Sequence, residues 1–216
     1  MNSTAIEMDR MYRWQRRIYD LTRKPYLLGR DRMIDALGVP PEGAVLEIAC
    51  GTGRNLIQAA RKYPHGTFHG FDISRAMLEQ ARHSVDRAGL GDQIELTFGD
   101  AEQFDVSVMF GRELYDRVFI SYSLSMIPQW RRTMDLAAST LAPGGALLIA
   151  DFYDCRNLPR VMKAFLYAWL RVFDVRPREN LHGGLEGLAK AHRLNLDFEP
   201  LYGGYAALAL LRRPHV

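Results

Sequence analysis

Apolar residues recur along most of the chain in short runs, separated by stretches with a different spacing. Five short apolar runs predict strands, at residues 44–49, 67–71, 94–98, 115–121 and 146–150. Three intervening stretches carry apolar residues at helical spacing, at residues 55–62, 74–88 and 129–141. Strands that alternate with helices of this length indicate βαβ units. They predict a parallel sheet with its ligand crevice at the carboxyl ends of the strands.

The end of the chain breaks this alternation. Residues 158–173 predict an apolar, aromatic helix, and residues 186–191 a second helical piece. Residues 194–202 and 205–211 predict two strands joined by a Gly-Gly turn, which would add one antiparallel strand to the sheet. We therefore expect an α/β protein with a doubly wound, mostly parallel, seven-stranded sheet.

The beginning of the chain predicts a helical arm. Over residues 8–22 the apolar side chains share one arc of a helix and the arginines lie on the other side. Pro25 should end or bend this helix, and a second short helix is expected at about residues 28–37. The pattern divides the chain into an amphipathic arm, residues 1–38, and one main domain, residues 39–216.

Composition adds a local basic excess to this picture. The 216 residues carry a net charge of only +3, but residues 10–32 hold eight Arg and Lys against two Asp. Such an excess suits an anionic membrane surface or a nucleic acid, and a solvated helix face is the alternative. The two cysteines have no disulfide or zinc spacing, no apolar run could span a bilayer, and the first residues do not resemble a signal peptide. We expect a cytoplasmic protein that meets a membrane only at its inner face, as a peripheral protein.

A turn with two glycines follows the first predicted strand of the main domain. Glu47 lies within that strand, Gly51 and Gly53 in the turn, and Asp72 at the end of the next strand. Glycine lets the backbone pass close to a ligand, and a carboxylate at Asp72 can accept both hydroxyls of a ribose, which indicates a nucleoside. A dinucleotide site needs a third glycine where this chain has Leu56. Glu47 suits a ligand with a positively charged amino acid part better than a pyrophosphate.

These segments resemble the motifs of the class I S-adenosylmethionine-dependent methyltransferases. The similar segments are residues 47–53, 70–74, 99–102 and 141–145, within a resemblance that covers about residues 39–216. The resemblance implies a Rossmann-like methyltransferase fold, a catalytic main domain and S-adenosylmethionine as the methyl donor. Ala49 departs from the pattern, because many members have glycine there, and we expect its small side chain to do little harm.

The resemblance also implies which residues contact the donor. Its implied contacts are Glu47 and Gly51 with the methionine part, Asp72 with the ribose, Ile73 and Ala101 with the adenine, and Asp100 with the adenine amino group, while Ala49, Gly53 and Ser121 complete the predicted donor site. An NAD-dependent oxidoreductase and a catalytically silent protein of the same fold are the competing classes. Leu56 disfavours the first and the intact motif disfavours the second. No nucleic-acid partner is expected, since no strand shows an aromatic platform for stacking bases.

Aromatic residues cluster near the expected mouth of the site, which bears on the methyl acceptor. They are Tyr12, Trp14, Tyr19, Tyr122, Phe152 and Tyr153. Aromatic faces attract quaternary ammonium groups, so the cluster favours an amine acceptor that becomes a trimethylammonium, although core packing is the alternative for each ring. The chain has neither an Asn-Pro-Pro-Tyr motif nor a metal cluster, and we expect no metal.

A second, narrower resemblance lies in residues 12–24, 27–31 and 121–128. These segments look like those of the bacterial betaine-lipid N-methyltransferases, which convert the homoserine headgroup of a diacylglyceryl lipid to its trimethyl form. The resemblance implies a lipid headgroup as substrate and an anionic membrane surface as partner. The predicted substrate or membrane contacts are Tyr12, Arg16, Arg17, Lys24 and Tyr153. A phosphatidylethanolamine N-methyltransferase and a soluble small-molecule methyltransferase are the alternatives, and the oligomeric state stays open.

The expected reaction is in-line attack by a neutral amine on the methyl group. Most of the catalysis would come from positioning and desolvation of the nucleophile. Tyr19, Tyr122 or His182 could relay the proton that the amine must lose, and the sequence does not choose among them. His182 precedes two glycines, which is more typical of a loop histidine than of a base.

Overall fold

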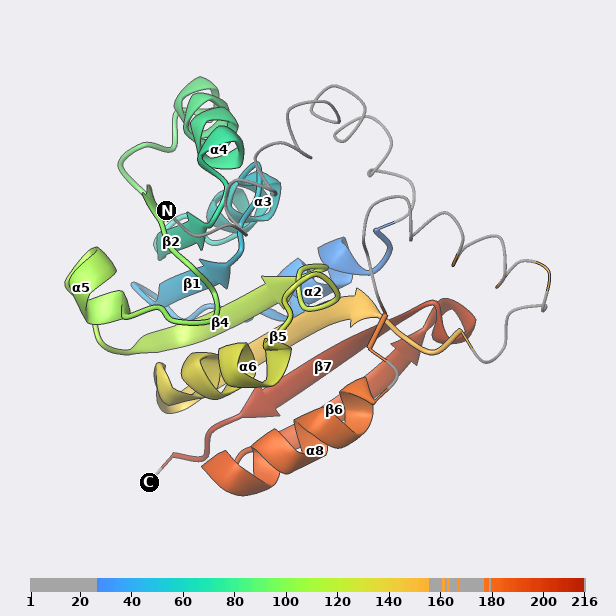
Figure 1. Ribbon diagram of the computed structural model, residues 1–216. Helices are drawn as coiled ribbons and strands as arrows, with labels where there is room; N and C mark the ends of the chain where they lie inside the picture. The colour runs from blue at the N-terminus through green and yellow to red at the C-terminus, as the bar shows by residue number, and fades with distance from the viewer. Residues whose placement is uncertain are drawn as a thin grey trace.

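The computed structural model describes residues 27–155, 161, 163, 167, 177–178 and 180–215. Seven strands form one sheet in the order β3-β2-β1-β4-β5-β7-β6 (Figure 1). The strands are β1 (Ala44–Ile48), β2 (Thr67–Asp72), β3 (Ile94–Phe98), β4 (Tyr115–Ser121), β5 (Leu141–Phe152), β6 (Asn195–Leu201) and β7 (Ala206–Arg212). β7 runs antiparallel to both of its neighbours, and the pairs among β3, β2, β1, β4 and β5 are parallel. The predicted doubly wound, mostly parallel, seven-stranded sheet is confirmed.

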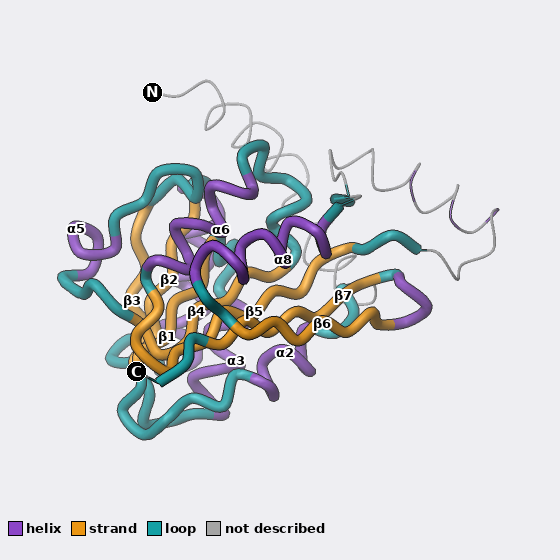
Figure 2. Tube along the Cα trace, turned by 90° about the horizontal axis from the view of Figure 1, so that it is seen from below, coloured by secondary structure: helices purple, strands orange, loops and turns teal. Residues whose placement is uncertain are grey.

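Helices cover both faces of the sheet. Those within the described residues are α2 (Arg30–Ala36), α3 (Arg54–Lys62), α4 (Arg75–Ala88), α5 (Val106–Phe110), α6 (Trp130–Ser139) and α8 (Leu181–His192). One core lies between the sheet and α2, α3 and α4, and a second between the sheet and α5, α6 and α8 (Figure 2). Because both faces are covered, every residue of the central strand β1 is buried.

Three elements differ in extent from the sequence prediction. β5 begins at Leu141 instead of residue 146, and α5 was not predicted, since five residues are too few to show a helical period. α8 begins at Leu181 instead of residue 186, although glycines disfavour a helix there. A Cβ at Gly184 would lie 2.5 Å from the Trp130 ring of α6, so close packing of the two helices explains that glycine. The predicted helix at residues 8–22 lies outside the described residues, as does most of the one at 158–173.

The second helix of the predicted arm, α2, packs into the main domain. Met33, Ile34 and Leu37 are buried in the same core as α3 and α4. Arg32 donates a hydrogen bond of 2.8 Å to Glu199 at the far edge of the sheet. α2 is therefore part of the core that supports the sheet, and the division of the chain into an arm of residues 1–38 and a main domain of residues 39–216 stays a prediction.

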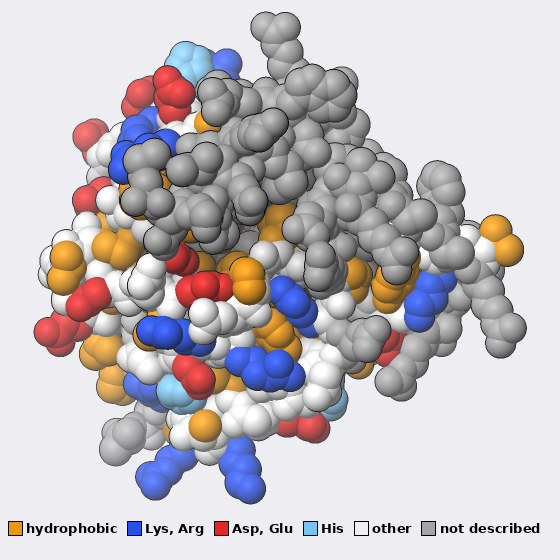
Figure 3. Space-filling view, in the orientation of Figure 1, with side chains coloured by type: hydrophobic (Ala, Val, Ile, Leu, Met, Phe, Trp, Pro, Cys, Tyr) orange, Lys and Arg blue, Asp and Glu red, His pale blue; other side chains and the backbone are white. Residues whose placement is uncertain are grey.

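Charge on the described surface is mixed. In Figure 3 the Lys and Arg side chains on the described part of this face are interspersed with Asp and Glu. Most of the basic excess in residues 10–32 lies outside the described residues. In the part of the chain that the structure covers, none of the helices has the length and apolar character needed to cross a membrane.

Candidate functional site

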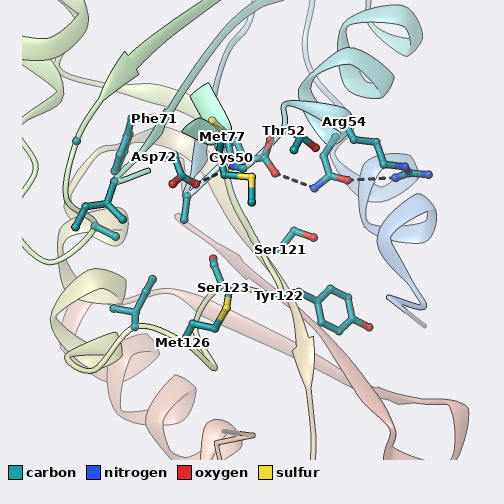
Figure 4. Close-up of a pocket in the computed structure, with 18 of the residues that line it drawn as sticks. Cys50, Thr52, Arg54, Phe71, Asp72, Met77, Ser121, Tyr122, Ser123 and Met126 are labelled. Atoms are coloured by element: carbon teal, nitrogen blue, oxygen red, sulfur yellow. Dashed lines mark hydrogen bonds between the residues drawn. The ribbon is translucent and has the colours of Figure 1, made fainter. Parts of the chain in front are cut away.

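A cavity of about 890 Å³ opens at the carboxyl ends of β1, β2 and β4 (Figure 4). The strand order reverses between β1 and β4, and ligands of doubly wound sheets bind at such a switch point. Small-molecule sites range from about 300 to 1,000 Å³, so this volume is at the large end of that range. All the predicted donor-site residues except Gly53 line this cavity.

The turn after β1 takes a tight left-handed path. Ala49, Gly51 and Gly53 all have positive φ, at 57°, 55° and 75°. Glycine adopts this conformation at little cost, whereas a residue with a Cβ is strained by roughly 1–2 kcal/mol. Ala49 thus holds the conformation that glycine would hold, so its departure from the motif leaves the path of the turn intact. Gly53 lies behind the cavity, where a Cβ would be 3.2 Å from Ala81 of α4.

Asp72 fixes this turn from the end of β2. Its Oδ2 accepts a hydrogen bond of 2.8 Å from the Gly51 N–H, and its Oδ1 accepts one of 2.9 Å from the Ser74 N–H. Ser74 in turn caps α4 by accepting from the Met77 N–H. The carboxylate therefore has a fixed orientation at the cavity wall, as a ribose-binding acid requires.

Glu47 is the most unusual charge in the site. Its side chain is 1% exposed, and Oε1 accepts a hydrogen bond of 2.8 Å from Asn55 Nδ2. Oε2 is buried without a hydrogen-bond partner among the described residues. Burial raises the pKa of Glu47 to about 8, against the opposing effects of the Asn55 hydrogen bond and the Arg30 charge. A buried carboxylate oxygen without a donor fits a cationic ligand, such as the amino group of S-adenosylmethionine.

Another part of the cavity wall combines apolar side chains with a carboxylate in a fixed position. Ile73 and Ala101 line it together with Asp100, as predicted for the adenine end. Asp100 Oδ1 accepts a hydrogen bond of 2.9 Å from the Glu102 N–H, and Oδ2 accepts one of 3.1 Å from Gln103 Nε2. The acid is held in place by its own turn, with its side chain at the cavity.

The last residue of β4 and the loop that follows it, residues 121–129 together, form the opposite wall. Cys50 and Asp72 lie on one side of the view in Figure 4, and Tyr122, Ser123 and Met126 on the other. Distant segments hold this loop: Ser125 N–H donates to Asp151 Oδ2 (3.2 Å), Gln129 N–H to Glu102 Oε1 (2.8 Å), and Arg178 to the carbonyls of Leu124 (2.9 Å) and Ile127 (2.6 Å).

The Tyr122 side chain holds the start of this loop against neighbouring parts of the fold. Its ring is buried against Phe152, with ring centroids 4.8 Å apart, and its hydroxyl donates a hydrogen bond to the Leu28 carbonyl. Burial raises the pKa of the Tyr122 hydroxyl above its ordinary value, so it stays neutral. The hydroxyl already donates a hydrogen bond to the Leu28 carbonyl, so the structure does not support its predicted role as a proton relay.

Of the other predicted catalytic and substrate residues, the structure describes His182 and Tyr153. His182 lies in the first turn of α8 instead of a loop, with its ring 4.5 Å from Phe198 and Nδ1 3.8 Å from Glu186. Tyr153 packs on the same Phe198 ring at 5.1 Å. Neither is among the described residues that line the cavity, so the structure does not support His182 as the base. Tyr12, Arg16, Arg17, Tyr19 and Lys24 lie outside the described residues.

Two cavity residues escaped the sequence interpretation. Asn55 donates the hydrogen bond to Glu47, and its place in the first turn of the helix after the glycine turn was the available signal. Arg30 lines the cavity from α2, and burial, then the neighbouring Arg54, lower its pKa to about 10. It therefore remains a cation at neutral pH. Arg54 donates to Asp31 at 2.9 Å, whereas Arg30 Nε donates to the Leu27 carbonyl at 3.3 Å.

Comparison with known proteins agrees with this geometry. Residues 45–145 match the family described as a methyltransferase domain. The methyltransferase GfsG of Streptomyces halstedii is 28% identical over 151 residues, which are 70% of this chain and 52% of that protein. The ubiquinone/menaquinone biosynthesis C-methyltransferase UbiE of Roseobacter denitrificans is 27% identical over 152 residues, 70% of this chain and 57% of that protein. The chain thus spans little more than half the length of these relatives.

Solved structures show the same fold. An O-methyltransferase family protein from Burkholderia thailandensis superposes with a TM-score of 0.69 and 20% identity, over 91% of this chain and 59% of that one. The chain therefore has the fold of these methyltransferases, and its residues 45–145 match a methyltransferase domain. S-adenosylmethionine is the methyl donor that this family and fold imply.

Proposed function

We propose that this protein transfers methyl groups from S-adenosylmethionine to the amino nitrogen of a lipid headgroup, that of diacylglyceryl-homoserine. The observation that carries methyl transfer is the pairing, in one cavity, of the fixed Asp72 carboxylate with the buried Glu47 Oε2 that has no hydrogen-bond donor among the described residues. These two acids suit the ribose and the amino group of the donor. The donor, when bound, supplies a methyl group activated by a sulfonium.

The chain's own residues would bind and orient the two reactants. Glu47 and Asp72 hold the donor between β1 and β2, with Ile73, Asp100 and Ala101 at the adenine end. The loop after β4 faces them and leaves the remaining space for the acceptor. Fixing both partners in one cavity removes the entropy cost of their encounter, which is a large part of the barrier to transfer.

The lipid acceptor is supported by charge and by sequence. Arg30 and Arg132 place cationic side chains at the cavity, and a homoserine headgroup carries a carboxylate beside its amine. Leu27, Met126 and Ile127 add apolar surface to the same cavity. The resemblance of residues 12–24 and 121–128 to betaine-lipid N-methyltransferases points to the same headgroup.

A membrane surface is the partner that this acceptor requires. A basic, amphipathic helix can lie in the interface and deliver the site to lipid headgroups. Residues 10–32 carry the basic excess that such a helix needs, including Arg16, Arg17 and Lys24. We therefore propose peripheral binding at the inner, anionic face of the membrane.

A soluble acceptor methylated on carbon or oxygen is the second candidate. The relatives include proteins named C-methyltransferase and O-methyltransferase. Phosphatidylethanolamine is the further lipid alternative, since it offers a primary amine at the same interface.

The test is turnover on defined liposomes. Purified protein and S-adenosylmethionine are mixed with liposomes that contain diacylglyceryl-homoserine, or phosphatidylethanolamine, or neither, and S-adenosylhomocysteine and lipid mass are followed. Gains of one, two or three methyl masses on the homoserine lipid alone support the proposal. Gains on phosphatidylethanolamine alone favour that lipid, and binding of the donor without methylation of either lipid would overturn the lipid acceptor.

A further inference from the structure

Two serine hydroxyls at and just after the carboxyl end of β4 have no hydrogen-bond partner among the residues that the structure describes. Ser121 Oγ and Ser123 Oγ are both buried and unpaired among the described residues, and both residues line the cavity. Ser123 as a whole is only 4% exposed. A buried hydroxyl without a partner costs about 1–3 kcal/mol, so a ligand that supplies the missing bond gains that energy on binding.

The strand register brings Ser121 next to the methionine end of the donor site. β1 and β4 are parallel neighbours, with Glu47 opposite Phe119 and Ile48 opposite Ile120. Side chains two residues apart in a strand share a face, so Ser121 lies on the same face as Phe119 and therefore as Glu47. Ser121 is thus a diagonal neighbour of the carboxylate that we assign to the donor's amino group.

Other polar groups of this loop either hold it in place or, like the Ser125 hydroxyl, lie away from the described cavity wall. The Tyr122 hydroxyl donates to the Leu28 carbonyl, and the Ser125 N–H donates to Asp151. Ser125 is not among the described residues of the cavity wall. The hydroxyls that the loop leaves for a ligand beside the donor are those of Ser121 and Ser123.

We infer that the Ser121 and Ser123 hydroxyls bind the nucleophilic group of the methyl acceptor, and that at the first transfer this group is a nitrogen or oxygen that carries hydrogen instead of a carbon. The inference rests on the proposed methyl transfer. It adds the two side chains that orient the nucleophile, and it excludes the carbon acceptor of the second candidate function. A hydroxyl can accept an N–H or O–H of the acceptor and leave a lone pair of that atom free. A carbon nucleophile offers no such donor and would leave both hydroxyls unpaired.

This binding mode is consistent with the balance of the transfer. The lone pair of the nucleophile forms the bond to the methyl carbon as the methyl–sulfur bond breaks, and the sulfur keeps the bonding electrons. The nucleophile then carries a positive charge, and where it still bears hydrogen it sheds a proton to water. A third transfer to the same nitrogen leaves a permanent positive charge. The serines remain neutral throughout and serve to orient the lone pair.

The first measurement uses sinefungin, a donor analogue in which a carbon replaces the sulfonium sulfur and an amino group on that carbon replaces the methyl group. Its ammonium reaches the position of the transferred methyl, where the two serines would accept its hydrogens, while S-adenosylhomocysteine lacks that group. We expect Ser123→Ala to lower the preference for sinefungin over S-adenosylhomocysteine by about five- to tenfold in calorimetry, and Ser121→Ala with Ser123→Ala by more. In Ser123→Ala, the affinity for S-adenosylhomocysteine itself should stay within about twofold.

The matched control is Ser125→Ala, which removes a buried hydroxyl from the same loop but not from the cavity wall, and should leave the preference unchanged. An unchanged preference in the double variant, or an equal loss in Ser125→Ala, would overturn the inference. A loss of S-adenosylhomocysteine affinity in Ser123→Ala would also overturn it, because the serine would then be structural.

The outcome is separable from the lipid proposal. If the preference falls in the serine variants but neither lipid is methylated, the serine site stands and the lipid acceptor is wrong. If the wild-type protein binds neither sinefungin nor S-adenosylhomocysteine, both the proposed methyl transfer and the serine site are wrong. Where the homoserine lipid is methylated, Ser123→Ala should raise its KM or lower its kcat without changing the KM for the donor.

Discussion

The two halves of the cavity are held together in different ways. The donor half, at the ends of β1 and β2, is fixed by hydrogen bonds between residues 2 to 21 positions apart, such as Ser74 with Asp72 and Gly51 with Asp72. The acceptor half, residues 121–129, is fixed by partners 26 to 94 positions away, from Asp151 to Leu28. One half is a local motif, and the other is assembled from distant parts of the fold.

This difference has consequences for function. A change in the donor half should act on donor affinity directly, because its residues line the proposed donor site and bond one another. A change at a distant support of the acceptor half should act on the acceptor alone. Four substitutions or conditions test the contrast, beginning with the largest effect.

Asp72→Asn should weaken S-adenosylmethionine binding by roughly 10- to 150-fold. The amide has one acceptor oxygen where the carboxylate has two, and a hydrogen bond to a charged group contributes about 1.5–3 kcal/mol. Calorimetric titration measures the Kd. Asp105→Asn is the control, since Asp105 also accepts from backbone N–H groups, but at the exposed start of α5. Equal Kd values for the two variants would contradict the role of Asp72.

Donor affinity should rise with pH below the pKa of Glu47. Burial raises that pKa to about 8, so below pH 8 the carboxyl must lose a proton before it can pair with the donor's ammonium. One linked proton gives a tenfold change per pH unit, or about 30-fold between pH 6 and 7.5. Titrations across this range measure the slope. Glu47→Gln should bind more weakly and without the slope, and a slope that survives in this variant would assign it to another group.

Arg178→Met should raise the acceptor KM by about tenfold while the donor Kd changes by less than about twofold. The substitution removes the hydrogen bonds that hold the Leu124 and Ile127 carbonyls in the acceptor loop. Steady-state kinetics with the acceptor that the wild-type protein methylates gives the KM. Arg213→Met is the control, because Arg213 also donates to two carbonyls, those of Leu141 and Ala138, which are not among the described residues of the cavity wall. A matching loss in the control would mean general destabilisation.

Tyr122→Phe should have the smallest effect, about fivefold on the acceptor KM, with an unchanged pH profile. It keeps the buried ring and removes one hydrogen bond, that to the Leu28 carbonyl, worth about 0.5–1.5 kcal/mol. Tyr63→Phe is matched, since the Tyr63 hydroxyl also bonds backbone groups near α2, and should lower stability without changing kinetics. A pH profile altered only in Tyr122→Phe would restore the tyrosine as a proton relay.

The same contrast explains what the sequence could predict. The alternation of apolar strands and helices sets the order of elements, and glycines before an acid at the end of the next strand identify the donor half. The predicted donor-site residues Glu47, Asp72 and Asp100 accordingly line the cavity. These signals are readable because the residues that cooperate lie close together in the chain.

The acceptor half carries no such signal. A tyrosine after β4 suggested a proton relay, but only the fold shows that its hydroxyl faces the Leu28 carbonyl. His182 was considered as a base, and only the packing of α8 shows its ring against Phe198. Arg30 was missed because its approach to the cavity depends on how α2 packs on the sheet, which no spacing within residues 28–37 reveals.

The short segment of residues 27–30 touches both halves at once. Leu27 and Arg30 line the cavity, while the carbonyl of Leu28 between them holds Tyr122 of the acceptor loop. A ligand in one half of the cavity that shifts or fixes this segment therefore changes the affinity of the other half for its own ligand. Thermodynamic linkage makes such an effect reciprocal: whatever factor the donor applies to the affinity for the acceptor, the acceptor applies to the affinity for the donor.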